Sequence, residues 1–341
     1  SGSMAANATS DFNVAIGTNT LGKLTNDGTT ANTAVGYKAA ETMTTGTKNT
    51  AVGYEALKSC DDGLNNTALG YQALTADAGN NNTGLGYLAL RANSGAQNTA
   101  VGAQACVNMG GGANNVSLGM NSLLDVVDGS QNVAIGSQAI GGTLGTTADN
   151  ASDLIAIGYQ ALGGNWENVA LTDNIAIGTS AMGGAINGAI NCIAIGRETL
   201  DGVLTTGANG TVGIGYQALK ALTTGQYNTA IGFEAGLVLT ELDKNTLIGY
   251  QTGKALSGSA GGGTHTFVGY KAGAANTSGN SNTFVGSEAG TSTTTGLQNV
   301  AMGRGALFTA DGGESNNVAI GRDAMYSVNN DGSDDNICLG V

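Results

Sequence analysis

Apolar positions alternate with small or polar ones in a five-residue phrase that recurs along the whole chain. It reads Asn, then Thr, Val or Ile, then a small residue, then an aliphatic residue and Gly, as in residues 32–36 and 317–321. The closing glycines stand at positions 17, 36, 53, 70, 86, 102, 119, 136, 158, 178, 196, 215, 232, 249, 269, 286, 303, 321 and 340. A period of 16 to 22 residues, most often 17, predicts a solenoid with one coil per repeat.

The alternation inside the phrase predicts a strand with two different sides. In all nineteen copies position four is Ile, Val, Leu or Met, and position two is Thr, Val or Ile. A period of two is typical of a strand with one buried side, so we expect positions two and four to face the interior of the coil. Position three is Ala in twelve copies, and its small size predicts that the backbone of a neighbouring chain approaches that side.

Position one predicts a structural ladder. It is Asn in fifteen of nineteen copies, and Leu154, Cys192, Thr211 and His265 are the exceptions. Stacked coils place such amides about 4.8 Å apart, so a ladder of side-chain hydrogen bonds is expected. The residues that illustrate it are Asn32, Asn49, Asn66, Asn82 and Asn98. The closing glycine fits a corner with positive φ or a close backbone approach.

A second phrase, typically Tyr-polar-Ala-Leu, follows each glycine, as in residues 54–57 and 71–74. We interpret it as a second strand or a tight turn whose Ala packs inward, while polar residues such as Lys38, Glu55, Gln72 and Lys271 face water. A stretch rich in Gly, Thr, Asn and Ser then closes the coil and absorbs the variation in length.

Composition supports one repeat array and excludes several classes of function. Residues 1–12 are interpreted as a tag remnant and an N-terminal cap, and residues 13–341 as a continuous all-β array of about nineteen coils. The net charge of −13 disfavours nucleic-acid binding, and without a run of about 18 apolar residues no membrane insertion is expected. Four scattered cysteines predict free thiols instead of a disulfide framework or a zinc site, and no cofactor or metal is expected.

The phrases at residues 13–17 and 132–136 resemble the head repeats of YadA-type trimeric autotransporter adhesins. The longer form Asn-Thr-Ala-Val-Gly-Tyr-x-Ala-Leu is similar to shaft repeats of phage tail fibres and related bacterial tail-fibre proteins. The resemblance implies a left-handed parallel β-roll, assembled as an intertwined or side-by-side homotrimer on a virion tail fibre or at the cell surface.

Some features depart from that resemblance. Position three becomes Leu247, Phe267 and Phe284 in the C-terminal third, and if this column lined a threefold axis these residues would widen or plug its centre. Nothing matches the self-cleaving chaperone that often ends tail-fibre relatives. The sequence stops just after a repeat glycine, so we expect a truncated or processed protein.

Aromatic side chains are the candidate receptor contacts. Eight of the ten tyrosines directly follow the glycines, and Tyr54, Tyr71 and Tyr87 represent this column. A half-exposed aromatic column would stack against sugar rings, and the alternative is ring-on-ring packing along the array. Trp166 lies in an insertion and is the best single candidate for a receptor contact. Its alternative is that the ring folds down over a neighbouring coil.

The polar candidates favour structural roles. The acidic stretches hold Asp125 with Asp128, Asp311 with Glu314, and Asp331 with Asp334 and Asp335. None forms a complete calcium loop, so solvated turns are the expected reading. His265 is the sole histidine and is interpreted as a ladder substitute able to donate and accept hydrogen bonds.

Three functions remain open from the sequence. The first is a structural and adhesive fibre without enzyme activity, either a phage-like tail fibre or a surface adhesin, which binds a cell-surface glycan or protein receptor at many sites. The second is a polysaccharide-degrading tail spike, ranked lower because no pair of carboxylates recurs. The third is an ice-binding solenoid, prompted by the Thr column at position two and ranked lowest because that column is expected to be dry.

Overall fold

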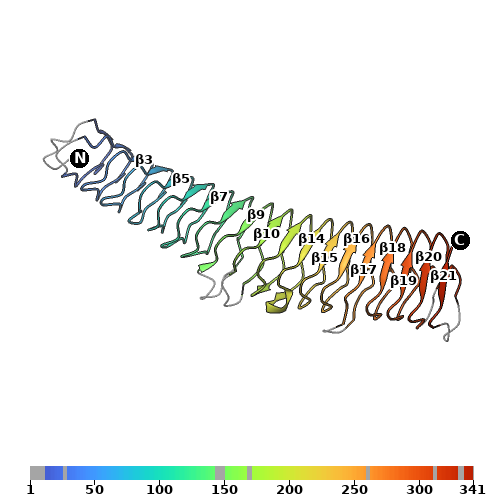
Figure 1. Ribbon diagram of the computed structural model, residues 1–341. Helices are drawn as coiled ribbons and strands as arrows, with labels where there is room; N and C mark the ends of the chain where they lie inside the picture. The colour runs from blue at the N-terminus through green and yellow to red at the C-terminus, as the bar shows by residue number, and fades with distance from the viewer. Residues whose placement is uncertain are drawn as a thin grey trace. The chain divides into compact units, whose positions relative to one another are not determined.

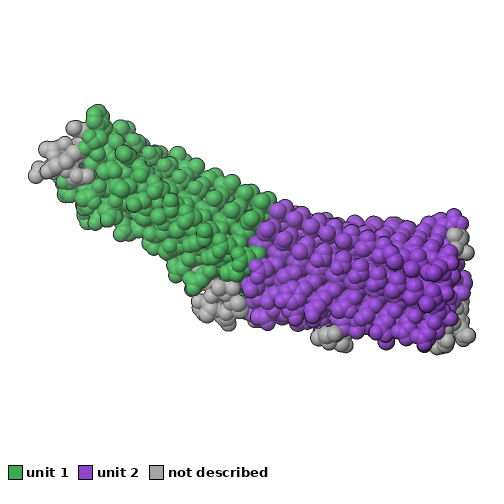
Figure 2. Space-filling view, in the orientation of Figure 1, with its two compact units in different colours: residues 1–173 green, residues 174–341 purple. Residues whose placement is uncertain are grey.

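The protein is a parallel β-solenoid of about 18 turns. The computed structural model describes residues 12–25, 29–142, 150–166, 171–258, 262–309, 313–328 and 334–340. No α-helix occurs within these ranges. The chain divides into two compact units, residues 1–173 and residues 174–341 (Figure 2). The expectation of an all-β solenoid is therefore confirmed.

Every copy of the five-residue phrase supplies one three-residue strand, from its second to its fourth position. Unit 1 contains β1 (Val14–Ile16), β2 (Thr33–Val35), β3 (Thr50–Val52), β4 (Thr67–Leu69), β5 (Thr83–Leu85), β6 (Thr99–Val101), β7 (Val116–Leu118), β8 (Val133–Ile135) and β9 (Ile155–Ile157). Unit 2 contains β10 (Ile175–Ile177), β12 (Ile193–Ile195), β14 (Val212–Ile214), β15 (Thr229–Ile231), β16 (Thr246–Ile248), β17 (Thr266–Val268), β18 (Thr283–Val285), β19 (Val300–Met302), β20 (Val318–Ile320) and β21 (Ile337–Leu339). Two-residue strands β11 (Ile186–Asn187) and β13 (Leu204–Thr205) belong to two successive coils and pair in parallel, and the 3-10 turn η2 (Thr206–Ala208) follows β13.

Strands of successive coils within each unit lie side by side and parallel (Figure 1). The register matches equivalent positions, so that Ala34 pairs with Ala51 in unit 1 and Phe267 pairs with Phe284 in unit 2. Each position of the phrase therefore forms a column that runs along the unit. Counting from the Asn, the aromatic residue after the glycine is position six, and the Ala and Leu of the second phrase are positions eight and nine.

The strand has the opposite orientation to the one that its hydrophobicity predicts. Position three points inward, and Ala34, Ala51 and Ala68 are fully buried within the single chain. Positions two and four point outward, and Leu69 is 51% exposed. The prediction that positions two and four fill the interior was therefore wrong, as was the prediction that a neighbouring chain packs on position three.

The interior is narrow, which explains the small residue at position three. The Tyr-polar-Ala-Leu phrase forms a turn in which Ala56 and Leu57 are fully buried, so its Ala does pack inward as predicted. The Leu column meets the strand from across the coil: a Cβ built on Gly84 would lie 3.3 Å from Leu74 Cγ. One large column and one small column fill the space between the two walls.

The large residues at position three are accommodated inside their own chain. In the coils of Leu247, Phe267 and Phe284, position nine is glycine in place of the usual Leu. All three side chains are fully buried, and a Cβ on Gly253 would lie 2.9 Å from Leu247 Cδ2. The column faces the core of a single solenoid, so the condition that it lines a threefold axis is not met.

Both reasons proposed for the closing glycine apply. Gly53 has φ +136°, which L side chains rarely adopt. A Cβ at that site would also overlap the carbonyl of Gly70 in the next coil. The coils therefore stack backbone against backbone at this corner, and no other residue type fits.

Candidate functional site

The asparagine column is an internal ladder between side chains and backbone. Asn32 Oδ1 accepts the backbone N–H of Asn49 at 2.9 Å, and Asn49 Oδ1 accepts that of Asn66 at 2.8 Å. The Asn49 Nδ2 donates to the carbonyl of Gly63 at 2.7 Å. The same pattern continues through Asn82 and Asn98. These buried amides satisfy backbone groups where each coil closes, which is a structural role.

The outer face of the sheet carries an apolar column. At position four the exposed large apolar side chains are Leu69, Val101, Ile231, Ile248, Met302 and Ile320, in addition to those of the terminal strands β1 and β21. Position two beside them is half-buried, with Thr in β2 to β6 and in β15 to β18. Residues in register on successive strands form one continuous surface, so each unit presents a partly apolar outer face.

Aromatic rings follow the glycine corner and stack along the array. In unit 1 the ring centroids of Tyr37, Tyr54, Tyr71 and Tyr87 are separated by 5.2, 5.1 and 5.5 Å. In unit 2 the same column stacks Tyr216, Phe233, Tyr250 and Tyr270 at 5.0, 5.3 and 5.3 Å. The side chains are nevertheless between 40% and 52% exposed in the described part of both stacks, apart from the less exposed Tyr216.

The stacking determines what these tyrosines can offer a ligand. Neighbouring rings cover the faces of Tyr54 and Tyr71, whose planes differ by 7°, so only ring edges and hydroxyl groups reach solvent. At the outer rings, the Lys38 ammonium lies 5.6 Å from the centroid of Tyr37, and that of Lys271 lies 5.3 Å from Tyr270. This geometry favours the ring-on-ring alternative over stacking of sugar rings on Tyr54, Tyr71 or Tyr87.

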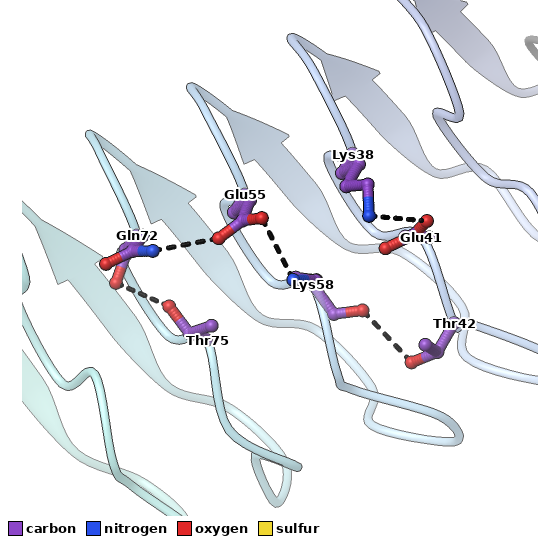
Figure 3. Close-up of polar contacts among 7 residues, drawn as sticks. All are labelled: Lys38, Glu41, Thr42, Glu55, Lys58, Gln72 and Thr75. Carbon is purple, nitrogen blue, oxygen red and sulfur yellow. Dashed lines mark hydrogen bonds and ion pairs between the residues drawn. The ribbon is translucent and has the colours of Figure 1, made fainter.

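A network of polar contacts accompanies the aromatic column (Figure 3). The Lys58 ammonium lies 2.9 Å from Glu55 Oε1, and Gln72 Nε2 of the next coil donates to Glu55 Oε2 at 2.8 Å. Lys38 pairs with Glu41 at 3.3 Å in the coil before. The hydrogen bonds from Lys58 and Gln72 lower the pKa of Glu55. The network thus ties successive coils together along the turn face.

Unit 2 repeats this arrangement twice. Glu198 Oε2 accepts from Lys220 Nζ and Gln217 Nε2, both at 2.7 Å, and these bonds lower the pKa of Glu198 to about 2. Glu234 is bound in the same way by Lys254 and Gln251. A glutamate at position seven, followed by Gln in the next coil, is therefore a recurrent polar motif. Glu55 is buried and Glu198 and Glu234 are half-buried, so the prediction that Glu55 faces water was wrong.

Trp166 is buried. Its side chain is 1% exposed, at the end of the described part of its insertion, since residues 167–170 lie outside the described ranges. The position fits the alternative in which the ring folds down over the array, because aromatic burial is strongly favourable. A buried ring offers no surface to a receptor in this conformation, so we leave Trp166 out of the proposed site.

His265 occupies the ladder as a neutral ring. Its Nδ1 accepts the backbone N–H of Asn282 at 3.3 Å, which leaves Nε2 to donate to the carbonyl of Gly279 at 2.9 Å. The backbone N–H of His265 itself donates to Asn245 Oδ1. Burial lowers its pKa to about 4. The ring therefore accepts one hydrogen bond and donates another, as an asparagine amide does at the other positions of the ladder.

The acidic loops accept hydrogen bonds from backbone and side-chain groups of neighbouring coils. Asp128 Oδ1 accepts the backbone N–H of Gly111 at 2.8 Å, and Asp125 Oδ1 accepts from Asn108 at 2.7 Å. Asp334 Oδ1 accepts the N–H of Ser315 at 2.7 Å. Asp311 and Asp331 lie outside the described residues, whereas Glu314 is buried and Asp335 has positive φ. No group of three metal-ligating side chains occurs within the described ranges.

All four cysteines carry free thiols. Cys60, Cys106 and Cys192 are buried, and Cys338 is half-buried in the last strand. Burial raises the pKa of Cys60 to about 11 and that of Cys106 to about 12. The buried thiols are thus poor nucleophiles, as expected for core residues.

Comparison with known proteins adds no identification. No protein-family model and no curated protein matches the chain. Among the described residues, no helix is long and apolar enough to cross a membrane. The outer face, the turn face and the repeat itself are therefore the features that bear on function.

Proposed function

We propose that this chain is a structural and adhesive fibre protein that assembles as a homotrimer and acts without hydrolase activity. It is either a tail fibre of a phage or phage-like particle or a surface adhesin. Its repeats, such as residues 13–17 and 132–136, resemble those of YadA-type adhesin heads and tail-fibre shafts. The fibre would supply rigid reach and many copies of a binding surface for a cell-surface glycan or protein.

The apolar outer face of the sheet carries this proposal. Monomeric soluble proteins rarely expose contiguous apolar patches above a few hundred Å². Here positions two and four face outward on all nineteen short strands, with Leu69, Val101 and Ile248 among the exposed side chains. A surface of this kind is stabilised by burial against a partner.

A second copy of the chain is the partner that fits best. The exposed side chains of the outer face repeat once per coil, so only a partner whose own side chains repeat with the same spacing along the array can contact them over many coils. A copy with parallel strands has that rise by construction. The net charge of −13 per chain opposes association weakly, since only 11% of residues are charged and salt screens them.

Sedimentation equilibrium tests the proposal. The native protein is expected to have about three times its chain mass of 33.5 kDa. Leu69→Lys introduces a charge on the outer face and should shift the protein towards monomer. Leu64→Lys is the matched control, because Leu64 is also exposed but lies in a loop outside the strand. A monodisperse monomer for the native chain, or equal behaviour of the two variants, contradicts the proposal.

Ice binding is a second candidate, now favoured by one observation. The Thr column was ranked low because it was expected to be dry, yet Thr33, Thr50 and Thr67 are half-exposed on the outer face. Position four beside them is aliphatic, and Val or Ile interrupts the Thr column between β6 and β15. The fibre therefore ranks first. Thermal hysteresis in the native protein, lost in Thr50→Lys, would favour ice binding instead.

A further inference from the structure

A pocket of about 330 Å³ opens on the turn face of unit 2, across the coils of β18, β19 and β20. It is lined by Glu288, Arg304, Gly305, Asp323 and Tyr326. Its volume lies at the small end of the range for ligand sites, about 300–1,000 Å³. None of the candidate residues from the sequence lies in it.

A missing side chain creates the pocket. Position seven of the coil is Glu288, Gly305 and Asp323 in three successive repeats, and every other complete coil has a side chain there. A Cβ built on Gly305 would lie 2.5 Å from Asp323 Oδ1, so the Asp323 carboxylate leans over the gap. Two strand spacings separate the backbones of Glu288 and Asp323, roughly 9–10 Å.

Glu288 lacks the partners that the other glutamates of its column have. Glu55, Glu198 and Glu234 each accept a hydrogen bond from Gln in the next coil and pair with a lysine at position ten. The next coil after Glu288 offers Gly305, and Phe308 stands at position ten. Among the described residues, neither the Glu288 carboxylate nor the Arg304 guanidinium forms an ion pair. The pocket therefore presents one acceptor group and one donor group without protein partners.

The charges of the pocket nearly balance. Asp323 Oδ2 lies 3.3 Å from Nε of Arg322, and the rest of the lining contributes one acidic residue, Glu288, and one basic residue, Arg304. Tyr326 stacks on Phe308, with centroids 4.8 Å apart, and remains 43% exposed. A neutral, polar ligand with several hydroxyl or amide groups and one apolar side matches this lining better than a cation does.

We propose that this pocket binds one saccharide unit, a neutral hexose or N-acetylhexosamine. Hydroxyl or amide groups of the sugar donate to Glu288 and Asp323, Arg304 donates to a sugar oxygen, and the sugar's apolar side meets Tyr326. The site rests on the proposed fibre for its role, because a weak single site becomes useful when several copies bind one surface.

Saturation-transfer NMR on the full chain tests the site. The probes are glucose, galactose, N-acetylglucosamine and N-acetylgalactosamine at millimolar concentration, with ethylammonium as a cation probe. Gly305→Gln should fill the gap, since Gln is the common residue of this column at similar φ, as at Gln72 with φ +50° against +64° for Gly305. Glu288→Gln removes the acceptor charge. Ser180→Gln is the matched control, because it adds the same side chain to the same column in another coil.

At least one sugar is expected to bind the native chain and the Ser180→Gln variant. Affinity should fall about tenfold or more in Gly305→Gln and Glu288→Gln, as for loss of a hydrogen bond to a charged group. Absence of binding by every sugar, binding of ethylammonium alone, or undiminished binding in both pocket variants overturns the proposal. Circular dichroism confirms that each variant is folded. Sedimentation on the same samples separates the two proposals, because a trimer that binds no sugar refutes only the pocket.

Discussion

The ring of Phe267 occupies the space that a side chain at Gly273 would need. A Cβ built on Gly273 would lie 2.8 Å from Phe267 Cζ, and the ring itself is fully buried. Phe284 and Gly290 repeat the relationship one coil later. Where position three is large, position nine of the same coil is glycine, whereas most coils with a small residue at position three have Leu or another aliphatic residue at position nine. The coil of Ala230 has Gly236 at position nine, where a Cβ would lie 2.9 Å from Leu247 Cδ1 of the next coil. The two columns share one volume.

This sharing predicts that the pair can be exchanged together but not singly. Phe267→Ala should cost about 3–5 kcal/mol of stability through the cavity it leaves. Gly273→Leu should be at least as costly, since the Phe267 ring blocks the new side chain. The double variant restores the common Ala and Leu pair and should recover most of the loss. Denaturant unfolding gives the loss in free energy of unfolding for each of the three variants. A loss in the double variant equal to the sum of the two single losses would contradict the shared volume.

The asparagine ladder predicts a loss of stability at each rung. Asn49→Ala would leave the backbone N–H of Asn66 and the carbonyl of Gly63 without partners inside the coil. The expected cost is about 1–3 kcal/mol for each unpaired buried group. Asn187→Ala, at an exposed position of β11, should change thermal stability little. Equal melting temperatures for the two variants would show that the ladder has no energetic role.

The histidine in the ladder predicts a specific loss of stability in mild acid. The folded-state pKa of His265 is about 4, below its ordinary 6.5. The unfolded chain therefore takes up the proton first, and the contribution of the neutral ring is complete above pH 6.5 and lost as the pH falls towards 4. The loss amounts to roughly 3 kcal/mol at most.

His265→Asn supplies the control for this effect. Asn is the usual residue of the ladder and does not titrate, so the variant should keep stability that the native chain loses between pH 6.5 and 4. Carboxylate titration affects both proteins alike and cancels in the difference. Denaturant midpoints measured across this range test the prediction. Parallel pH profiles for the two proteins would place the His265 ring in solvent.

Thiol reactivity should follow burial. Cys60 and Cys106 have raised pKa values of about 11 and 12, whereas Cys338 is the half-buried cysteine of the last strand. Iodoacetamide at pH 8 is therefore expected to modify Cys338 in the native protein well before the other three. Mass spectrometry of peptides after timed labelling measures the order. Early modification of Cys106 would contradict its place in the Leu column.

The sequence was sufficient for the coil, its glycine corner and its asparagine ladder, because each depends on one residue type in one column. It was misleading about which side of the strand is inside. Hydrophobicity favoured the side of Val52, but the coil interior that holds Leu57 takes only the small Ala51 from the strand. The paired changes at Phe267 and Gly273 were visible in the sequence and, taken together, place position three inside. The pocket at Gly305 depends on a single missing side chain, which no pattern of hydrophobicity reveals.

The inward direction of position three is the central claim, and thermal unfolding of two neighbouring variants tests it most directly. Ala68 is fully buried and Leu69 is 51% exposed on the same strand. Ala68→Lys would bury an unpaired charge at a cost of several kcal/mol, so its melting temperature should fall sharply. Leu69→Lys should leave the coil folded and should weaken only the association between chains. A stable Ala68→Lys variant beside an unfolded Leu69→Lys variant would contradict the account.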